Sequence, residues 1–120
     1  MSRPVVRLAF FALAIIASVS AQAQQSGKIY RVGFLSPNTS AIVSDSVDVL
    51  RAGLRDLGYV DGQNLVIEYR YAEGQLSRLP QLAAELVRLN VNVIIAPSSP
   101  SVMAARNATT QIPIVFSMTG

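Results

Sequence analysis

Apolar residues recur at helical spacing between Ala41 and Leu57. They are separated by four or three positions, which places them on one face of an α-helix: Val43, Val47, Leu50, Leu54 and Leu57. Gly58 follows directly and suits the left-handed conformation that ends helices. The pattern predicts an amphipathic helix over 41–57.

A second stripe of the same kind lies between Leu79 and Leu89. Its apolar members are Leu79, Leu82, Ala83, Leu86 and Leu89. Ser77 is the expected N-cap, Pro80 is tolerated in a first helical turn, and Asn90 can end the helix. A third and shorter helix is predicted over Ser101 to Ala108, where alanine is frequent.

Four segments between these helices are predicted strands, over 30–35, 65–71, 91–96 and 113–117. They are rich in β-branched, aromatic and other apolar residues and are bounded by turn residues such as Asp61-Gly62 and Pro97. The second strand alternates polar and apolar residues in its second half, which suits an edge strand. The continuous apolar run of the third fits a strand covered on both faces.

Strands and helices therefore alternate along the chain. This order predicts an α/β fold, an open parallel sheet with helices on both faces.

The first residues form a different pattern. Arg3 and Arg7 precede an uncharged apolar run over 8–17, and Ala21-Gln22-Ala23 follows. A charged start, an apolar middle and a small-x-small site are typical of a secretory signal peptide. We expect 1–23 to be removed during export and 24–120 to form the mature part, which is then a soluble periplasmic protein.

Charge and composition exclude several classes of function. The sequence has ten Lys and Arg against seven Asp and Glu, and loss of Arg3 and Arg7 leaves eight against seven. This balance gives no sign of nucleic-acid binding. Cys and His are absent, so Cys/His zinc sites and catalysis by a thiolate or an imidazole are excluded.

Turn residues that could bind a ligand follow three of the predicted strands. In open parallel sheets ligands bind beyond the carboxyl ends of the strands, and helix N-termini there favour anions. The candidate ligand-binding residues are Ser36, Pro37, Asn38, Thr39, Ser98, Ser99, Ser117 and Thr119. The same residue types also serve as ordinary helix caps, so a purely structural role for each remains open.

No enzyme motif is present, and we expect no catalytic residue, metal or cofactor. The chain lacks a phosphate-binding loop, a dinucleotide fingerprint and a nucleophile elbow. All seven carboxylates, Glu73 among them, fall on predicted helix surfaces, turns or an edge strand, where solvated surface is the favoured interpretation. Tyr69 and Tyr71 are interpreted as packing residues.

The segment from Leu50 to Arg70 closely resembles a family of bacterial ABC transporter substrate-binding proteins that includes tryptophan- and tyrosine-uptake proteins. Its most specific part is Leu57-Gly58-Tyr59-Val60-Asp61-Gly62-Gln63-Asn64. The resemblance continues through Ala72-Glu73-Gly74, 79–87 and 112–116. The turn Pro97-Ser98-Ser99-Pro100 departs from the Gly-Thr-Pro-like turn frequent in the family, which leaves ligand identity open.

The resemblance implies a type I periplasmic binding fold, in which paired α/β lobes close on a small molecule such as an amino acid or organic acid. The expected partner is an ABC permease in the inner membrane. Family members are longer, so 24–120 is expected to be a partial N-terminal lobe that by itself binds ligand weakly or undetectably.

Alternative functions remain open from the sequence. The lobe could report a ligand to a signalling partner, or the product could be truncated and have no independent function. An exported enzyme on a flavodoxin-like sheet would need glycines in the loop after the first strand, and 36–40 has none.

Overall fold

The computed structural model describes residues 27–116. The predicted signal peptide and the candidate residues Ser117 and Thr119 lie outside this range. None of the described helices is both long and apolar enough to cross a membrane.

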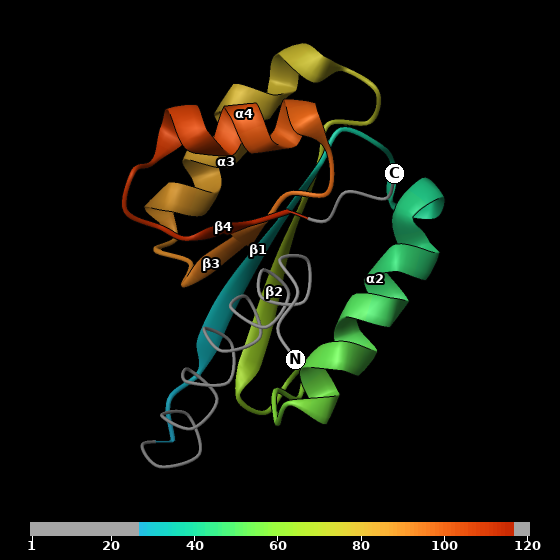
Figure 1. Ribbon diagram of the computed structural model, residues 1–120, viewed down its shortest axis with the longest axis vertical. Coiled ribbons are helices and arrows are strands. Elements are labelled where there is room, and N and C mark those ends of the chain that lie inside the picture. Colours follow the sequence, from blue (N-terminus) through green and yellow to red (C-terminus); the bar gives the residue numbers. More distant parts are fainter. Residues whose placement is uncertain (1–26, 117–120) are drawn as a thin grey trace, which may run out of the picture.

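The described strands form one parallel sheet in the order β2-β1-β3-β4 (Figure 1). These strands are β1 (Tyr30–Ser36), β2 (Leu65–Tyr71), β3 (Val93–Ile95) and β4 (Ile114–Val115). Every pairing is parallel, with Ser36 opposite Tyr71 at the end of β1 and β2. The predicted parallel sheet is confirmed, and β2 has the expected edge position.

Helices cover both faces of the sheet, as predicted. Helix α2 (Ser40–Asp56) packs on one face, whereas α3 (Leu79–Arg88) and α4 (Ser99–Ala108) pack on the other (Figure 1). A short 3-10 helix, η1 (Leu76–Arg78), precedes α3.

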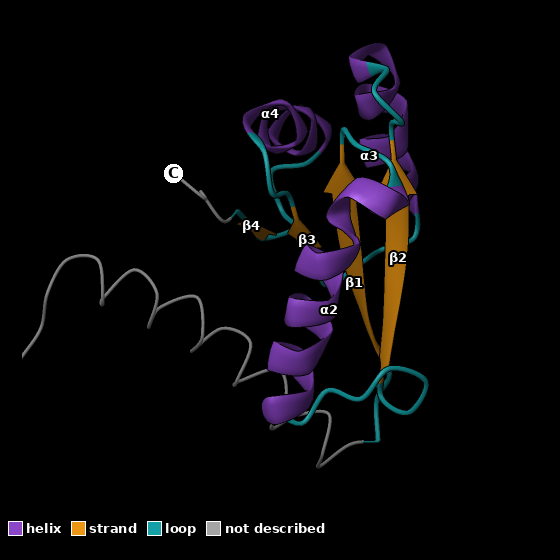
Figure 2. Cartoon of the chain, turned by 90° about the vertical axis from the view of Figure 1, so that its right-hand side faces the viewer, coloured by secondary structure: helices purple, strands orange, loops and turns teal. Residues whose placement is uncertain are grey.

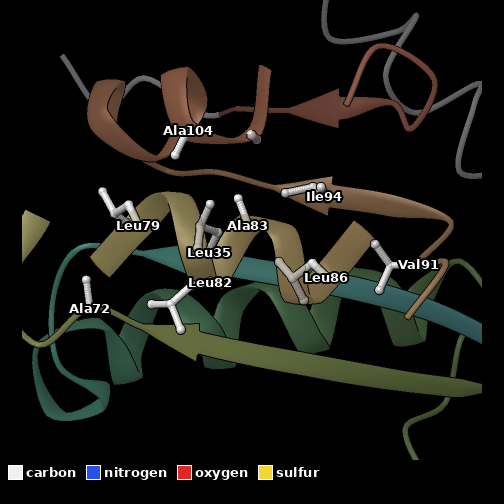
Figure 3. Close-up of a cluster of buried hydrophobic side chains, with 10 residues drawn as sticks. Leu35, Ala72, Leu79, Leu82, Ala83, Leu86, Val91, Ile94 and Ala104 are labelled. Carbon is white, nitrogen blue, oxygen red and sulfur yellow. The ribbon is translucent and has the colours of Figure 1, made fainter. Parts of the chain in front are cut away.

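Each face has its own hydrophobic cluster, because successive strand residues point to opposite sides. On the α2 face the buried residues are Tyr30, Val32, Phe34, Val43, Val47, Leu54, Tyr59, Leu65 and Ile67. On the other face α3 and α4 lie side by side on the sheet, and Leu35, Leu82, Leu86 and Ile94 are among the buried side chains (Figure 3). The stripes predicted from helical spacing are the buried faces of α2 and α3.

The residues predicted to end the first two helices do so in the structure, whereas one predicted N-cap is wrong. Gly58 has φ +96° and Asn90 has φ +54°, so both adopt the expected left-handed conformation after a helix. The prediction that Ser77 caps the second helix is wrong, because Ser77 lies inside η1 and α3 has no side-chain cap. The 3-10 helix η1 leads directly into α3, so the residue before α3, Arg78, has a helical rather than an extended backbone.

The remaining differences are in the lengths of elements. Strand β3 covers only 93–95. Just before it, Asn92 Oδ1 accepts a hydrogen bond from Arg31 N and Asn92 N donates to Arg31 O, both at 2.8 Å. Helix α4 begins at Ser99 rather than Ser101, since Ser98 caps it, and β4 is shorter than predicted.

Candidate functional site

The loops after β1 and β3 lie at the same edge of the sheet, the carboxyl rim. Both strands run in the same direction and are direct neighbours, so their carboxyl ends meet. Figure 2 shows the arrowheads of β1 and β2 at the end of the sheet where α2 begins. The candidate loops 36–39 and 97–99 are therefore brought together, as the sequence predicted.

These loops leave the sheet toward opposite faces. The chain passes from β1 to α2 on one face, and from β3 to α4 on the other. The strand order 2-1-3-4 reverses direction between β1 and β3, so this point is the topological switch of the sheet. Loops that diverge at a switch point leave a crevice between them, which is where open α/β sheets bind ligands.

The loop after β1 is held by its own polar groups. Ser36 is fully buried, and its hydroxyl accepts a hydrogen bond from the Asn38 backbone at 3.1 Å. Thr39 is the N-cap of α2, and its Oγ1 accepts from the Ile42 backbone at 3.3 Å. Asn38 is exposed and Pro37 is half-buried. Asn38 is therefore the side chain of this loop most available to a ligand, while Ser36 and Thr39 shape the backbone.

The loop after β3 contains a reciprocal cap. Ser98 and the buried Ser101 each accept from the other's backbone amide, at 3.5 Å and 3.2 Å, and their hydroxyl oxygens are 2.9 Å apart. Ser101 also donates to the Ser98 carbonyl at 2.9 Å. Ser98 is thus engaged in capping, and Ser99 is exposed at the first position of α4.

The two helix starts differ as possible anion sites. At α2 the amides of Ser40 and Ala41 have no hydrogen-bond partner among the described residues. At α4 the second position is Pro100, which lacks an N–H, and the third amide is used by the cap. The start of α2 therefore presents more unused donors to an anionic group.

A third segment reaches the same rim, although the sequence did not single it out as part of the site. Ala72 to Gly74 follow β2 and make backbone hydrogen bonds to the loop after β1: Ala72 N to Ser36 O at 2.9 Å, Glu73 N to Asn38 O at 3.3 Å, and Gly74 N to Pro37 O at 2.7 Å. The only sequence signal for this segment was the family resemblance, because the backbone contacts depend on the pairing of β1 with β2.

Aromatic residues lie beneath the rim on the α2 face. Tyr69 and Tyr71 stack with ring centroids 6.0 Å apart, and Phe34 meets each ring edge-on. Burial raises the pKa of the Tyr71 phenol. Both tyrosines are half-buried and pack against the α2 cluster, so their interpretation as packing residues is confirmed.

Some of the carboxylates in residues 27–116 form ion pairs, and no metal-binding cluster is found among the carboxylates of this range. No group of three or more Asp and Glu in this range is placed to hold a metal. Arg51 pairs with Asp61 at 3.1 Å, and Arg70 contacts Glu85 at 2.8 Å and Glu68 at 3.5 Å. Glu68 and Glu85 are half-buried rather than fully solvated as predicted, because Arg70 lies between them.

Two hollows in the described surface lie away from the carboxyl rim. One of about 300 Å³ is lined by residues of α3 and α4, including Ala84, Val87 and Ala104. Another of about 320 Å³ lies at the amino rim, beside Lys28, Arg31 and Asn92. Neither of these two hollows is lined by the candidate loops 36–39 and 97–99.

Comparisons with known proteins identify the family of this chain. Residues 38–120 match the model of a family described as ABC transporter substrate binding protein. A protein named tyrosine-binding protein, from Clostridioides difficile (strain R20291), is 38% identical over 63 residues, which are 52% of this chain and 18% of the relative.

Two solved structures are similar to this chain in fold. The ligand-free, open structure of a substrate binding protein with adhesive properties from Clostridium difficile superposes with a TM-score of 0.68 at 25% identity, covering 73% of this chain and 30% of that one. A conserved domain protein from Vibrio cholerae O1 biovar El Tor gives a TM-score of 0.70 at 30% identity, covering 75% and 30%. The chain spans less than a third of the length of each of these relatives.

Proposed function

Because this chain belongs to the ABC transporter substrate-binding protein family, we propose that it contributes to the periplasmic solute-binding component of an ABC transporter and that its ligand is an amino acid. The observation that carries the proposal is the pair of loops, 36–39 and 97–99, that diverge from adjacent parallel strands at the switch point of the sheet.

The character of these loops supports a small polar ligand. They expose Asn38 and Ser99, and the unused amides at the start of α2 favour a carboxylate. The similarity to a tyrosine-binding protein supports an amino acid, and L-tyrosine is the first ligand to test.

The divergence of the two loops at the switch point supports a mechanism of closure. A second lobe would supply the opposite wall of the site, exclude water and complete the hydrogen bonds of the ligand. The ligand then stabilises the closed form, for which it has the greater affinity. An ABC permease in the inner membrane would recognise that form. The signal-like pattern of 1–23 supports delivery to the periplasm.

Isothermal titration calorimetry on the purified gene product tests the proposal. We expect saturable binding of L-tyrosine or another standard amino acid when the gene product carries both lobes, and weak or undetectable binding by residues 24–120 alone. Asn38→Ala should weaken that binding, whereas Lys28→Ala, exposed at the amino rim, should leave it unchanged. A folded protein that binds none of the standard amino acids would contradict the proposed ligand class.

A further inference from the structure

The turn after β2 has a backbone conformation that its sequence does not favour. Gln75 N donates to Ala72 O at 3.0 Å, which closes a four-residue turn with Glu73 and Gly74 at its centre. Their φ angles are +56° and +84°. Turns with positive φ at both central positions prefer Asn-Gly or Asp-Gly, because a longer side chain gains no local hydrogen bond that offsets the strain.

Glu73 is unusual among the left-handed residues of the part of the chain that the structure describes. The others are Gly27, Gly58, Gly62, Gly74 and Asn90, all of them glycine or asparagine. A non-glycine residue held in a sparsely populated region is a reason to seek a function for its side chain. Asparagine or glycine would fit this turn better, so the backbone alone does not explain glutamate.

The position of Glu73 relates it to the candidate site. Its amide donates to Asn38 O, and the flanking amides of Ala72 and Gly74 donate to Ser36 O and Pro37 O. The turn therefore fixes the loop after β1 and sets Glu73 on the carboxyl rim beside it. Glu73 is exposed, and its carboxylate forms no ion pair with any residue in 27–116.

We infer that Glu73 is a specificity-determining residue whose carboxylate binds the ammonium group of the ligand. This inference rests on the proposed function and extends it. The amides at the start of α2 favour a carboxylate, and Glu73 adds a negative charge on the neighbouring loop. Groups of both kinds on one rim suit a zwitterion, and they discriminate against an organic acid that lacks the amine.

Calorimetry with L-tyrosine and with 3-(4-hydroxyphenyl)propionate, which lacks the amino group, tests the inference on the purified gene product. Glu73→Gln should weaken L-tyrosine binding roughly 10- to 100-fold, the range for losing a charge-assisted hydrogen bond. The same change should leave affinity for the deaminated analogue within about twofold, because that ligand has no ammonium group to lose.

Glu73→Asn is the matched control for folding. It removes the longer carboxylate and suits the left-handed backbone, so it should unfold at the same temperature as the wild type or higher while losing L-tyrosine affinity. Unchanged L-tyrosine affinity in both variants would overturn the inference and leave the proposed function standing. A wild-type protein that binds none of the standard amino acids would instead overturn the proposed ligand class and the role of Glu73 together.

Discussion

Gly33 in β1 lies directly against Leu86 of α3. A β-carbon at Gly33 would be 3.0 Å from Leu86 Cδ1 and 3.1 Å from Cδ2, closer than side chains normally approach. Leu86 is fully buried in the hydrophobic cluster formed by the sheet, α3 and α4, so it has little room to move (Figure 3). The absence of a side chain at Gly33 lets α3 approach the central strand closely.

We expect Gly33→Ala to lower the free energy of unfolding by about 1–3 kcal/mol, the usual cost of overpacking a core. Gly53→Ala is the matched control, because Gly53 lies inside α2 and a β-carbon added there would have no atom within 4 Å. That change should raise the free energy of unfolding by about 0.5–1 kcal/mol through helix propensity. Urea denaturation measures both, and equal stability of the two variants would contradict the close packing.

The reciprocal cap of α4 gives a second prediction. Ser101→Ala removes the buried hydroxyl that accepts from Ser98 N and donates to Ser98 O. The free energy of unfolding should fall by about 0.5–2 kcal/mol. Ser99→Ala, at the exposed position between them, should change it by less than about 0.5 kcal/mol. A similar loss in both variants would show that the cap adds no stability.

Asn64 holds the connection between α2 and β2 together. Its Oδ1 accepts from Val60 N at 2.8 Å, and its Nδ2 donates to Gly58 O at 2.9 Å. Asn64→Ala should lower the free energy of unfolding by about 1–3 kcal/mol, because half-buried backbone groups lose their partner. The neighbouring Gln63 is exposed, and Gln63→Ala is the control. Thermal unfolding distinguishes them, and an unshifted midpoint for Asn64→Ala would refute this role.

Alkaline pH should destabilise the protein through Tyr59. Burial raises the pKa of its phenol well above the usual range, and the neighbouring Tyr30 adds to the effect. The folded state keeps the proton that the unfolded state loses above pH ~10, so this contribution is complete below that pH and declines as the pH rises further. The free energy of unfolding should therefore fall less for Tyr59→Phe than for the wild type as the pH is raised from about 9 to about 11, roughly one unit below and above the pKa of the unfolded state. Identical alkaline profiles for the two proteins would contradict it.

The alternation of strands and helices could be predicted because each element carries a local signal. Strand β2 has its predicted bounds, since Asp61-Gly62 limits it at one end and its β-branched and aromatic residues are continuous. The buried stripes of α2 and α3 follow from spacing alone. The failure at Ser77 arose because a 3-10 turn and an extended cap use the same residue types.

The site was only partly predictable, because strand order is not a local property. The loops after β1 and β3 could be named from their turn residues, yet their adjacency depends on β3 pairing with β1. Glu73 was interpreted as solvated surface, which its exposure fits. Its closeness to Asn38 arises only from the pairing of β1 with β2. Its positive φ angle could not be predicted either, because glutamate is not a residue type that favours the left-handed conformation.

The most direct test of the central claim is a map of backbone amide chemical shifts in the purified gene product as L-tyrosine is added. We predict the largest changes at the carboxyl rim, in residues 38–42, 73–74 and 98–102. Changes confined to the amino rim, around Lys28, Arg31 and Asn92, would place the ligand at the opposite edge of the sheet and contradict the account.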